Sequence, residues 1–509
     1  MELRPSSSSS PSVSENPMHP SGAPLPSLLA AWEETLLRAA ERPAIYSPAA
    51  EVLRSFREIE EEARQWQGAF AGLQQGSVIA IQPGNHPSWP ALFLAALRCG
   101  LVTLPLGRHI GAAERTLALE TCHASALVEQ EEGAAPGHLR LVALGRQAVQ
   151  WPGPVPDLLK LTSGTTSAPR AIRVRQAQLL EDCLQICETM GIGEGDLNYA
   201  VIPLAHSYGF SNLVTPLLCK GVPMVVSDDR MPRAILDGLS RTGATVFPGM
   251  PVFFDKFAAL AAIATFGDLP PLPRLRLCIS AGAPLTPEVG ERFTAKFGLR
   301  VHTFYGSSEC GGIAYDGSEA GGYREGAVGF PMSRVKILPA GGEGTIVVEG
   351  PAVADGYWPE QQGEAGQNSV SQLANGRFIP ADLVHLTPGG LILSGRVSDL
   401  INVAGRKLNP REVEARLLEC PGVREAVVFG IASTLRHEDV VACVAGEVQA
   451  AEVLRFARGM LSGWQTPREI WVVPEIPRNE RGKINRRELA QRYGAMRHSL
   501  PQPVPESRS

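Results

Sequence analysis

The chain has 509 residues, of which 44% are hydrophobic and 19% charged, and its mean hydropathy is -0.01. These values exclude a disordered chain and indicate a protein with a large core divided among roughly two to four domains. The net charge of -5 gives no general basic field, so neither nucleic acid nor an anionic membrane is predicted as a partner.

The N-terminal end is rich in serine and proline. Residues 1–27 contain no apolar run, so we expect a disordered tail there and no secretory signal. From there to about residue 394, segments with helical and strand periodicity alternate. We expect an amphipathic helix over 57–73, a core helix over 89–100, and strands within 77–84, 101–106, 199–204, 222–228 and 244–250. This alternation predicts an α/β architecture without a transmembrane segment.

Nine cysteines are scattered along the chain, and no pair has the C-x-x-C spacing of many metal and redox sites. Such a set favours reduced thiols and a cytoplasmic location. Cys183 and Cys187 stand one helical turn apart, but no histidine lies nearby to complete a zinc site. We therefore expect both to be buried core residues.

The segment TSGTTSAPR, residues 162–170, combines small residues, hydroxyl groups and an arginine. Backbone N–H groups in such a loop can approach an anion, and the hydroxyl groups and Arg170 add further donors. The segment does not have the G-x-x-x-x-G-K-[ST] spacing of a P-loop. Taken alone, the segment is better explained as a solvated Ser/Thr loop. The candidate phosphate-binding residues are Thr162, Ser163, Gly164, Thr165, Thr166 and Arg170.

A change of pattern near residue 398 indicates a second domain. A polar turn leads into the amphipathic helix PREVEARLL, residues 410–418, and then into a β-branched strand. We expect an N-terminal domain over 28–397, a small α+β domain over 398–495, and a second disordered tail over 496–509.

Five segments in order resemble the adenylate-forming (AMP-binding) superfamily, and among its members the acyl- and aryl-CoA synthetases. They are TSGTTSAPRAI, SAGAPL, FYGSSECGG, the stretch from ADLVHL to NPREVE, and RNERGKINRREL. The resemblance extends from about residue 28 to about residue 495. It implies an α/β fold with a large N-terminal domain of several subdomains, a small mobile α+β C-terminal domain, and an active site between them. The large domain would contain mixed sheets with helices and a small β-barrel-like part.

The resemblance assigns the nucleotide site. Tyr305 would stack on the purine, Glu309 would bind Mg²⁺ together with Thr162, and Asp382 would accept hydrogen bonds from both ribose hydroxyls. Arg396 would contact ribose and phosphate. The further residues implied around the adenine and phosphates are Gly282, Ala283, Pro284, Gly306, Ser307 and Ser308.

The resemblance also assigns residues to the second domain. Lys483 would bridge the acyl carboxylate and the α-phosphate during adenylation. Ser398, followed by Asp399, would be the hinge about which the small domain rotates. Gly405, Arg406 and Lys407 would pass close to CoA, although Arg406 and Lys407 are equally consistent with solvated charges.

The segment PLAHSYGF, residues 203–210, resembles the PLxHxYG pattern of fatty-acid and aryl-acid ligases, in which the histidine is an aromatic gate near the carboxylate. It lacks the aspartate that peptide-synthetase domains place near this segment to pair with an α-amino group. His206 is the candidate gate. Core packing is an equal alternative for most of the implied acid pocket, which comprises His206, Tyr208, Phe210, Phe247, Gly249, Met250 and Phe304.

The resemblance implies an acid–thiol ligase that uses ATP, Mg²⁺ and CoA. A carboxylic acid would form an acyl-adenylate with release of pyrophosphate, and a thiol would then displace AMP. An acyl carrier protein ligase or a stand-alone adenylation enzyme is an alternative, because phosphopantetheine ends in the same thiol. A non-catalytic binder is a second alternative, since Ser167, Arg170 and Ser398 depart from the family pattern. The sequence leaves the acid, the thiol and the oligomeric state open.

Overall fold

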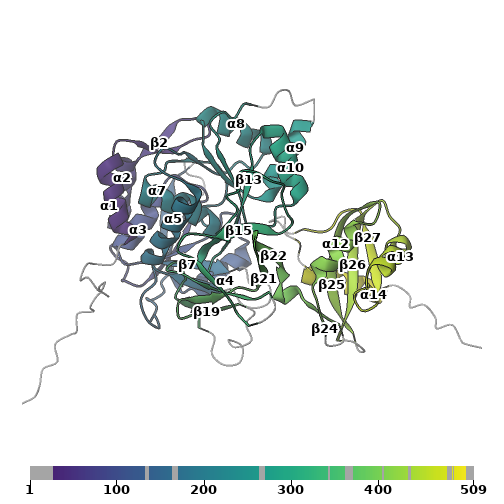
Figure 1. The fold of residues 1–509 in the computed structure, drawn as a ribbon. Helices are drawn as coiled ribbons and strands as arrows, with labels where there is room; N and C mark the ends of the chain where they lie inside the picture. Colours follow the sequence, from purple (N-terminus) through teal and green to yellow (C-terminus); the bar gives the residue numbers. More distant parts are fainter. Residues whose placement is uncertain are drawn as a thin grey trace, which may run out of the picture.

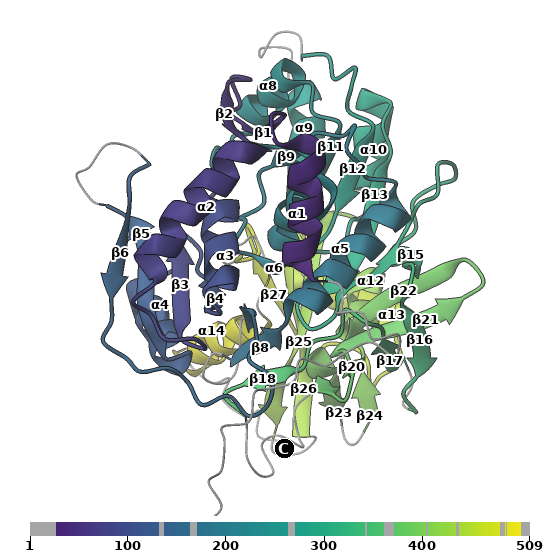
Figure 2. The same cartoon turned by 90° about the vertical axis from the view of Figure 1, so that its left-hand side faces the viewer.

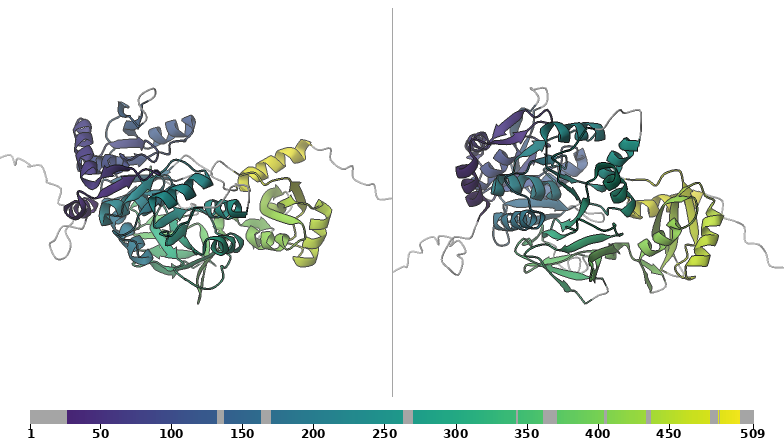
Figure 3. Two further views of the ribbon diagram at one scale, coloured as in Figure 1. Left: turned by 90° about the horizontal axis from the view of Figure 1, so that it is seen from above. Right: turned by 45° about the horizontal axis from the view of Figure 1, so that its top comes forward.

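The computed structural model describes residues 27–131, 137–162, 170–262, 270–341, 344–360, 371–403, 406–433, 437–478, 484 and 486–499. In Figures 1 and 3 a large α/β domain is followed by a smaller domain that begins after β22 (Gly390–Arg396). The large domain combines several sheets with helices and the smaller one is α+β, as the sequence predicts. Among the described residues, no helix has the length and apolar character required to cross a bilayer.

The first sheet of the large domain has seven strands. Its order is β18 (Gly356–Trp358), β8 (Arg170–Val174), β7 (Leu158–Thr162), β4 (Val102–Pro105), β3 (Val78–Gln82), β5 (Ala124–Gln130) and β6 (Leu139–Ala143). The core strands β3 and β4 are parallel and fully buried, as their apolar sequences predict. At one edge β7, β8 and β18 are antiparallel, which places residues far apart in sequence side by side.

The second sheet carries eleven strands. Its order is β2 (Val52–Ser55), β1 (Pro43–Tyr46), β10 (Met224–Val226), β9 (Asn198–Ala200), β11 (Val246–Gly249), β12 (Leu277–Ser280), β13 (Val301–Ser307), β14 (Gly311–Tyr315), β15 (Ala327–Pro331), β22 and β21 (Asp382–Thr387). Neighbouring strands from β10 to β13 are parallel, so their carboxyl ends lie at one edge of the sheet. A separate antiparallel sheet contains β16 (Lys336–Pro339), β17 (Ile346–Glu349), β20 (Arg377–Ile379) and β19 (Gln372–Ala374).

Helix α2 (Phe56–Phe70) shows how the local sequence specifies the elements. Ser55 and Glu58 form a capping box, in which the Ser55 hydroxyl accepts from the Glu58 N–H and the Glu58 carboxylate accepts from the Ser55 N–H. Ile59 and Ala63 are on the buried face. Figure 2 shows α2 beside α1 (Leu28–Ala39) and α3 (Trp89–Arg98) on one side of the large domain.

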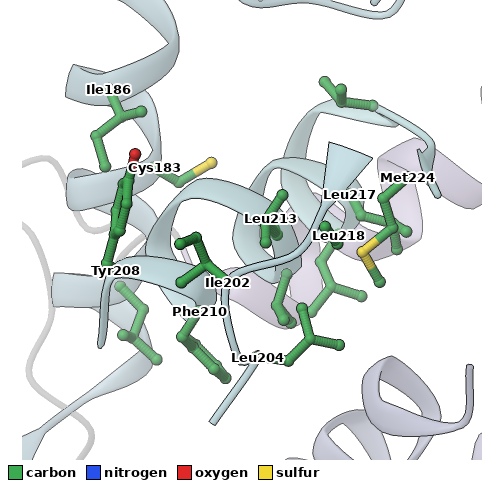
Figure 4. Close-up of a cluster of buried hydrophobic side chains, with 14 of the residues drawn as sticks. Cys183, Ile186, Ile202, Leu204, Tyr208, Phe210, Leu213, Leu217, Leu218 and Met224 are labelled. Carbon is green, nitrogen blue, oxygen red and sulfur yellow. The ribbon is translucent and has the colours of Figure 1, made fainter. Parts of the chain in front are cut away.

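The remaining helices of the large domain cover its sheets. They are α4 (Ala112–Thr121), α5 (Gln176–Met190), α6 (Ser207–Gly209), α7 (Thr215–Lys220), α8 (Pro232–Thr242), α9 (Pro251–Ala262) and α10 (Pro287–Phe297), with a π-helical turn over Phe210–Val214. Cys183 and Cys187 on α5 are buried and unpaired, as expected, and Cys183 packs in the cluster of Figure 4. Burial raises the pKa of Cys278, on β12, to about 12, so that thiol remains protonated at neutral pH.

The small domain has its own core. Its sheet has the order β24 (Arg406–Leu408), β23 (Ile401–Val403), β26 (His437–Gly446) and β25 (Val423–Ser433), and β27 (Glu469–Val473) pairs with β26. Helices α12 (Pro410–Leu418), α13 (Ala450–Met460) and α14 (Arg486–Ser499) complete it. Helix α14 continues through residues 496–499, where the sequence predicts a tail. Residues 1–26 and 500–509 of the predicted tails lie outside the described residues.

Candidate active site

Four of the predicted segments meet where the parallel strands of the larger sheet end. Residues 203–210 follow β9, Met250 follows β11, residues 281–284 follow β12, and residues 305–309 lie at the end of β13. The Tyr208 phenol donates to the Ile279 carbonyl at 3.2 Å, and the Ser207 and Ser308 hydroxyls lie 2.6 Å apart. The carboxyl ends of parallel strands are where ligands bind in open α/β sheets. This edge is therefore the candidate site.

Asp382 joins the strand that carries Tyr305 to the strand that carries Arg396. Asp382 and Arg396 are opposite each other on β21 and β22, and the Arg396 Nε donates to Asp382 Oδ1 at 3.0 Å. The Tyr305 phenol donates to Asp382 Oδ2 at 2.9 Å. Burial and the Asp382 charge raise the pKa of Tyr305, so the phenol remains a donor. Burial lowers the pKa of Arg396, but Asp382 more than offsets this, and the net shift is upward.

Glu309 receives a hydrogen bond on each carboxylate oxygen. The Ser307 hydroxyl donates to Oε2, and the Tyr357 phenol donates to Oε1 at 3.0 Å. The Glu309 main-chain carbonyl also accepts from the Ala354 N–H at 2.9 Å. Burial, followed by the Glu309 charge, raises the pKa of Tyr357. The sequence did not point to Tyr357, because an aromatic residue on a short strand does not show which distant segment it faces.

Arg170 lies at the other side of Tyr357. Its guanidinium carbon is 4.2 Å from the centroid of the Tyr357 ring, a cation–π contact. Arg170 begins β8 opposite Thr162 of β7, and Tyr357 lies on β18, which pairs with β8. The predicted residues Ser163, Gly164, Thr165 and Thr166, and the side chain of Thr162, lie outside the described residues.

The predicted adenine segment is an exposed turn after β12. Gly282, Ala283 and Pro284 are all exposed, and Gly282 has a φ of 81°, a conformation that favours glycine. Position 306 needs glycine for a steric reason, because a Cβ there would lie only 2.8 Å from the Gly311 carbonyl oxygen. An exposed turn and a compact strand end thus lie side by side, because β12 and β13 are paired.

His206 and Tyr208 occupy different environments. His206 is exposed, and its Nδ1 accepts a hydrogen bond from the Tyr208 N–H at 3.2 Å. Tyr208 is buried, with its ring 5.8 Å from that of Phe304 on β13. Met250 is half-buried, and its Cγ is 4.0 Å from where a Cβ on Gly282 would lie. His206 is thus solvent-exposed at the edge of the sheet that carries the candidate site.

Four of the predicted pocket residues belong to the hydrophobic core, and Phe210 and Phe247, each 1% exposed, are buried more completely than Tyr208 at 9% and Phe304 at 7%. Phe210 makes edge contacts with Trp89 and Phe93, at centroid distances of 5.7 and 5.0 Å, and Figure 4 shows it among buried aliphatic side chains. Phe247 is 1% exposed and contacts Phe253, Phe254 and Phe257. Packing explains the glycine at position 249, because a Cβ there would lie 2.8 Å from the Phe247 ring. We therefore base no acid contact on Phe210 or Phe247.

The predicted hinge is a turn held by the small domain. Ser398 lies within a 3-10 turn over Val397–Asp399, and its side chain is outside the described residues. Asp399 accepts a hydrogen bond from Arg486 at 2.9 Å, and the same guanidinium binds both oxygens of Glu414 at 2.8 and 2.9 Å. Arg486, three residues after Lys483, is thus a second residue whose role the sequence did not reveal.

The predicted CoA and adenylation residues are described only in part. The Arg406 guanidinium lies 5.4 Å from the Trp464 ring centroid, so it already has an aromatic partner within the small domain. Gly405, Lys483 and the side chain of Lys407 lie outside the described residues. Among the described residues, no group of three or more His, Cys, Asp or Glu side chains could hold a metal ion.

Comparison with known families identifies the chain. The family model for AMP-binding enzymes matches residues 32–358, and that for the AMP-binding enzyme C-terminal domain matches residues 412–483. The chain belongs to the AMP-binding enzyme family. This membership confirms the resemblance to adenylate-forming, acyl/aryl-CoA synthetase-like proteins.

Relatives of this AMP-binding enzyme match it over most of their length. A feruloyl-CoA synthase from Amycolatopsis sp. is 26% identical over 457 residues, which cover 83% of this chain and 90% of the relative. A benzoate–CoA ligase from Thauera aromatica is 25% identical over 464 residues, covering 82% and 86%. The crystal structure of ATP-bound MatB from Rhodopseudomonas palustris superposes with a TM-score of 0.76 at 23% identity, covering 92% of this chain and 99% of that one. This structural likeness establishes the fold.

Proposed function

We propose that this enzyme uses ATP to activate a carboxylic acid, releases pyrophosphate, and transfers the acyl group from the acyl-adenylate to the thiol of CoA. The arrangement of Asp382, Tyr305 and Arg396 at the carboxyl edge of the sheet is the observation that carries the proposal. Feruloyl-CoA synthase and benzoate–CoA ligase among the relatives support CoA as the acceptor.

The ATP assignment is supported by the chemistry of Asp382. Its side chain is 21% exposed, so it lies at the surface of the site while both of its oxygens are held in place. Each oxygen accepts one hydrogen bond from Tyr305 or Arg396 and retains a lone pair for a ribose hydroxyl. The exposed turn Gly282–Pro284 offers the adenine an open backbone edge next to β13.

The residues at Glu309 fit a magnesium ion. Mg²⁺ prefers oxygen ligands and is often bound by one or two carboxylates together with substrate phosphates. Both Glu309 oxygens accept from neutral hydroxyl groups, which orient the carboxylate without neutralising its charge. Glu309 would hold the ion together with Thr162. Bound there, the ion would supply positive charge to the phosphate oxygens of ATP.

In the first half-reaction, a carboxylate oxygen of the acid attacks the α-phosphorus of ATP. The new P–O bond forms as the bond to the β-phosphate breaks, and the electron pair of that bond leaves with pyrophosphate. Arg170 and Lys483 stabilise the added negative charge. In the second half-reaction, the small domain rotates about Ser398, and the thiol sulfur attacks the acyl carbon and displaces AMP.

The acid is an acyl or aryl carboxylate in this proposal. Met250 is half-buried beside the turn at Gly282, the buried Tyr208 and Phe304 rings pack against each other, and the exposed His206 lies at the end of the same sheet. An aromatic edge with few charges suits the uncharged part of such an acid. We assign the gate near the carboxylate to His206.

A screen of pyrophosphate release tests the proposal. Aliphatic, aryl and amino acids would be supplied with ATP and hydroxylamine, which traps acyl-adenylates, with and without CoA. We expect acid-dependent pyrophosphate from acyl or aryl acids and an acyl-CoA product. Pyrophosphate release without acyl-CoA would instead support a carrier protein as acceptor. ATP binding without pyrophosphate release across the panel would indicate a non-catalytic relative.

Lys483→Ala separates the two half-reactions. This change should abolish acid-dependent pyrophosphate release but largely spare thioester formation from preformed acyl-adenylate, because the lysine acts only in the first step. Lys296→Ala, an exposed position on α10, is the matched control and should leave both activities intact. Equal loss of both activities in Lys483→Ala would disprove the assigned role.

A further inference from the structure

Tyr357 contacts two parts of the candidate site that are remote in sequence. Its phenol donates to Glu309 Oε1 at 3.0 Å, and its ring lies under the Arg170 guanidinium with 4.2 Å between the guanidinium carbon and the ring centroid. One side chain thus joins the carboxylate assigned to the metal with the cation assigned to the phosphates.

The strand that carries Tyr357 is fixed on both sides. Tyr357 on β18 is opposite Ile172 on β8, so Arg170 is its diagonal neighbour on the same face. The next residue, Trp358, packs on Trp151 with 4.9 Å between ring centroids. These contacts hold the strand independently of Glu309, and the phenol lies within hydrogen-bond distance of both Glu309 and the Ser371 hydroxyl, the latter at 3.2 Å.

The same segment contacts Glu309 at its main chain. The Ala354 N–H donates to the Glu309 carbonyl at 2.9 Å, three residues before Tyr357 donates to the side chain. The Ser307 hydroxyl binds the other carboxylate oxygen. Both the position and the rotation of the carboxylate are therefore determined, and the lone pairs that remain face a fixed direction.

We propose that Tyr357 is a positioning residue that orients Glu309 for its cation and Arg170 for the nucleotide phosphates, and so couples the metal and phosphate sides of the site. This inference rests on the proposed function, which assigns Glu309 to the metal and Arg170 to ATP. The hydroxyl acts on Glu309 and the ring acts on Arg170, so the two contributions can be separated by mutation.

Two substitutions separate them. Tyr357→Phe removes the hydrogen bonds of the phenol to Glu309 and Ser371 but keeps the ring under Arg170, whereas Tyr357→Leu also removes the ring contact. Tyr323→Phe is a matched control, because the Tyr323 ring also lies under an arginine, Arg300, at 4.5 Å, and its phenol accepts from the Val301 N–H at 2.8 Å. It has the same kind of contacts but does not touch Glu309.

The measurement is the affinity of the full-length protein for α,β-methylene-ATP, determined by calorimetry over a series of Mg²⁺ concentrations. For Tyr357→Phe we expect the Mg²⁺ midpoint to rise about tenfold, the scale of a hydrogen bond to a charged group, with near-normal affinity at saturating Mg²⁺. Tyr357→Leu should add a loss of affinity of about threefold that Mg²⁺ does not restore. Tyr323→Phe should leave the midpoint unchanged.

The outcomes distinguish this inference from the function on which it rests. An unchanged Mg²⁺ midpoint in Tyr357→Phe, with a raised midpoint in Glu309→Gln, would overturn the role of Tyr357 alone. An unchanged midpoint in Glu309→Gln, or no Mg²⁺-dependent binding by the wild type, would overturn both. Loss of affinity at every Mg²⁺ concentration in Tyr357→Phe, with the same fall in melting temperature as Tyr323→Phe, would show a purely structural role and overturn the proposal.

Discussion

Asp382→Ala should weaken ATP binding more than it weakens the fold. The carboxylate accepts from the Tyr305 phenol at 2.9 Å and from Arg396 at 3.0 Å. The bond to the buried Tyr305 contributes about 1.5 kcal/mol as a hydrogen bond to a charged group. The pair with Arg396 contributes less than about 1 kcal/mol, because the Arg396 side chain is 61% exposed and solvent screens it. The free energy of unfolding should therefore fall by about 2 kcal/mol.

The effect on ATP is larger because both ribose hydroxyls lose a charged acceptor. Two such bonds at about 1.5 kcal/mol each correspond to a rise in the dissociation constant of about 150-fold. Calorimetry with α,β-methylene-ATP measures this directly. Asp382→Asn is the conservative control, since it keeps one oxygen acceptor and should weaken binding about tenfold.

A comparison of nucleotides makes the result specific to the ribose. Wild-type protein should bind ATP more tightly than 2′-deoxy-ATP or 3′-deoxy-ATP, and Asp382→Ala should remove that preference. A merely structural defect would weaken all three nucleotides equally and preserve their ratios. An unchanged dissociation constant for ATP, or an unchanged preference among the nucleotides, would refute the assignment of Asp382 to the ribose.

Three further predictions concern stability. Burial raises the pKa of Glu60, but hydrogen bonds from arginines and a tryptophan more than reverse this, so the net pKa is lowered. The Glu60 carboxylate thus stabilises the fold fully above its unfolded pKa of about 4.3, and this stabilisation is lost as pH falls through the folded pKa. Glu60→Gln should lower the free energy of unfolding by about 3 kcal/mol at neutral pH. When this free energy is measured by urea unfolding at a series of pH values, it should fall less steeply in acid than it does for the wild type. The same fall as in the wild type would contradict this. Gly311→Ala should strongly lower the melting temperature, because the φ of residue 311 is 71° and an added Cβ would overlap a buried carboxylate. Gly298→Ala is the control: its φ is 66° but its Cβ would meet open space, so it should cost only about 1 kcal/mol of stability. Equal effects of the two substitutions would disprove the packing argument. Arg486→Ala should expose the Asp399 turn to proteolysis, because the guanidinium anchors it to the small domain, and an unchanged cleavage pattern would contradict that role.

Local structure could be predicted well from the sequence. The helix expected over residues 57–73 is α2 (Phe56–Phe70), and the one expected over 410–418 is α12 (Pro410–Leu418). Both carry polar caps and a repeating apolar face, which are features within a few residues of each other. The family motifs also led us to assign Asp382 and Arg396 to one site, and the two residues are paired in the structure.

Contacts between distant segments could not be predicted in the same way. Tyr357 meets Glu309 across 48 residues, and Ser207 meets Ser308 across 101 residues. Such pairs depend on which strands become neighbours, and the periodicity of the sequence does not predict strand pairing. The same limit applies to Phe210, because an apolar side chain near a site motif has the same pattern whether it lines a pocket or fills the core.

Transfer of oxygen from the acid to AMP tests the central claim most directly. An acid carrying ¹⁸O in its carboxylate would be incubated with ATP, Mg²⁺ and CoA, and the products would be analysed by mass spectrometry. Attack of the carboxylate on the α-phosphorus leaves one labelled oxygen on AMP when the thiol displaces it, so we expect label in AMP and none in pyrophosphate. Label in inorganic phosphate with ADP as product, or unlabelled AMP, would contradict formation of an acyl-adenylate.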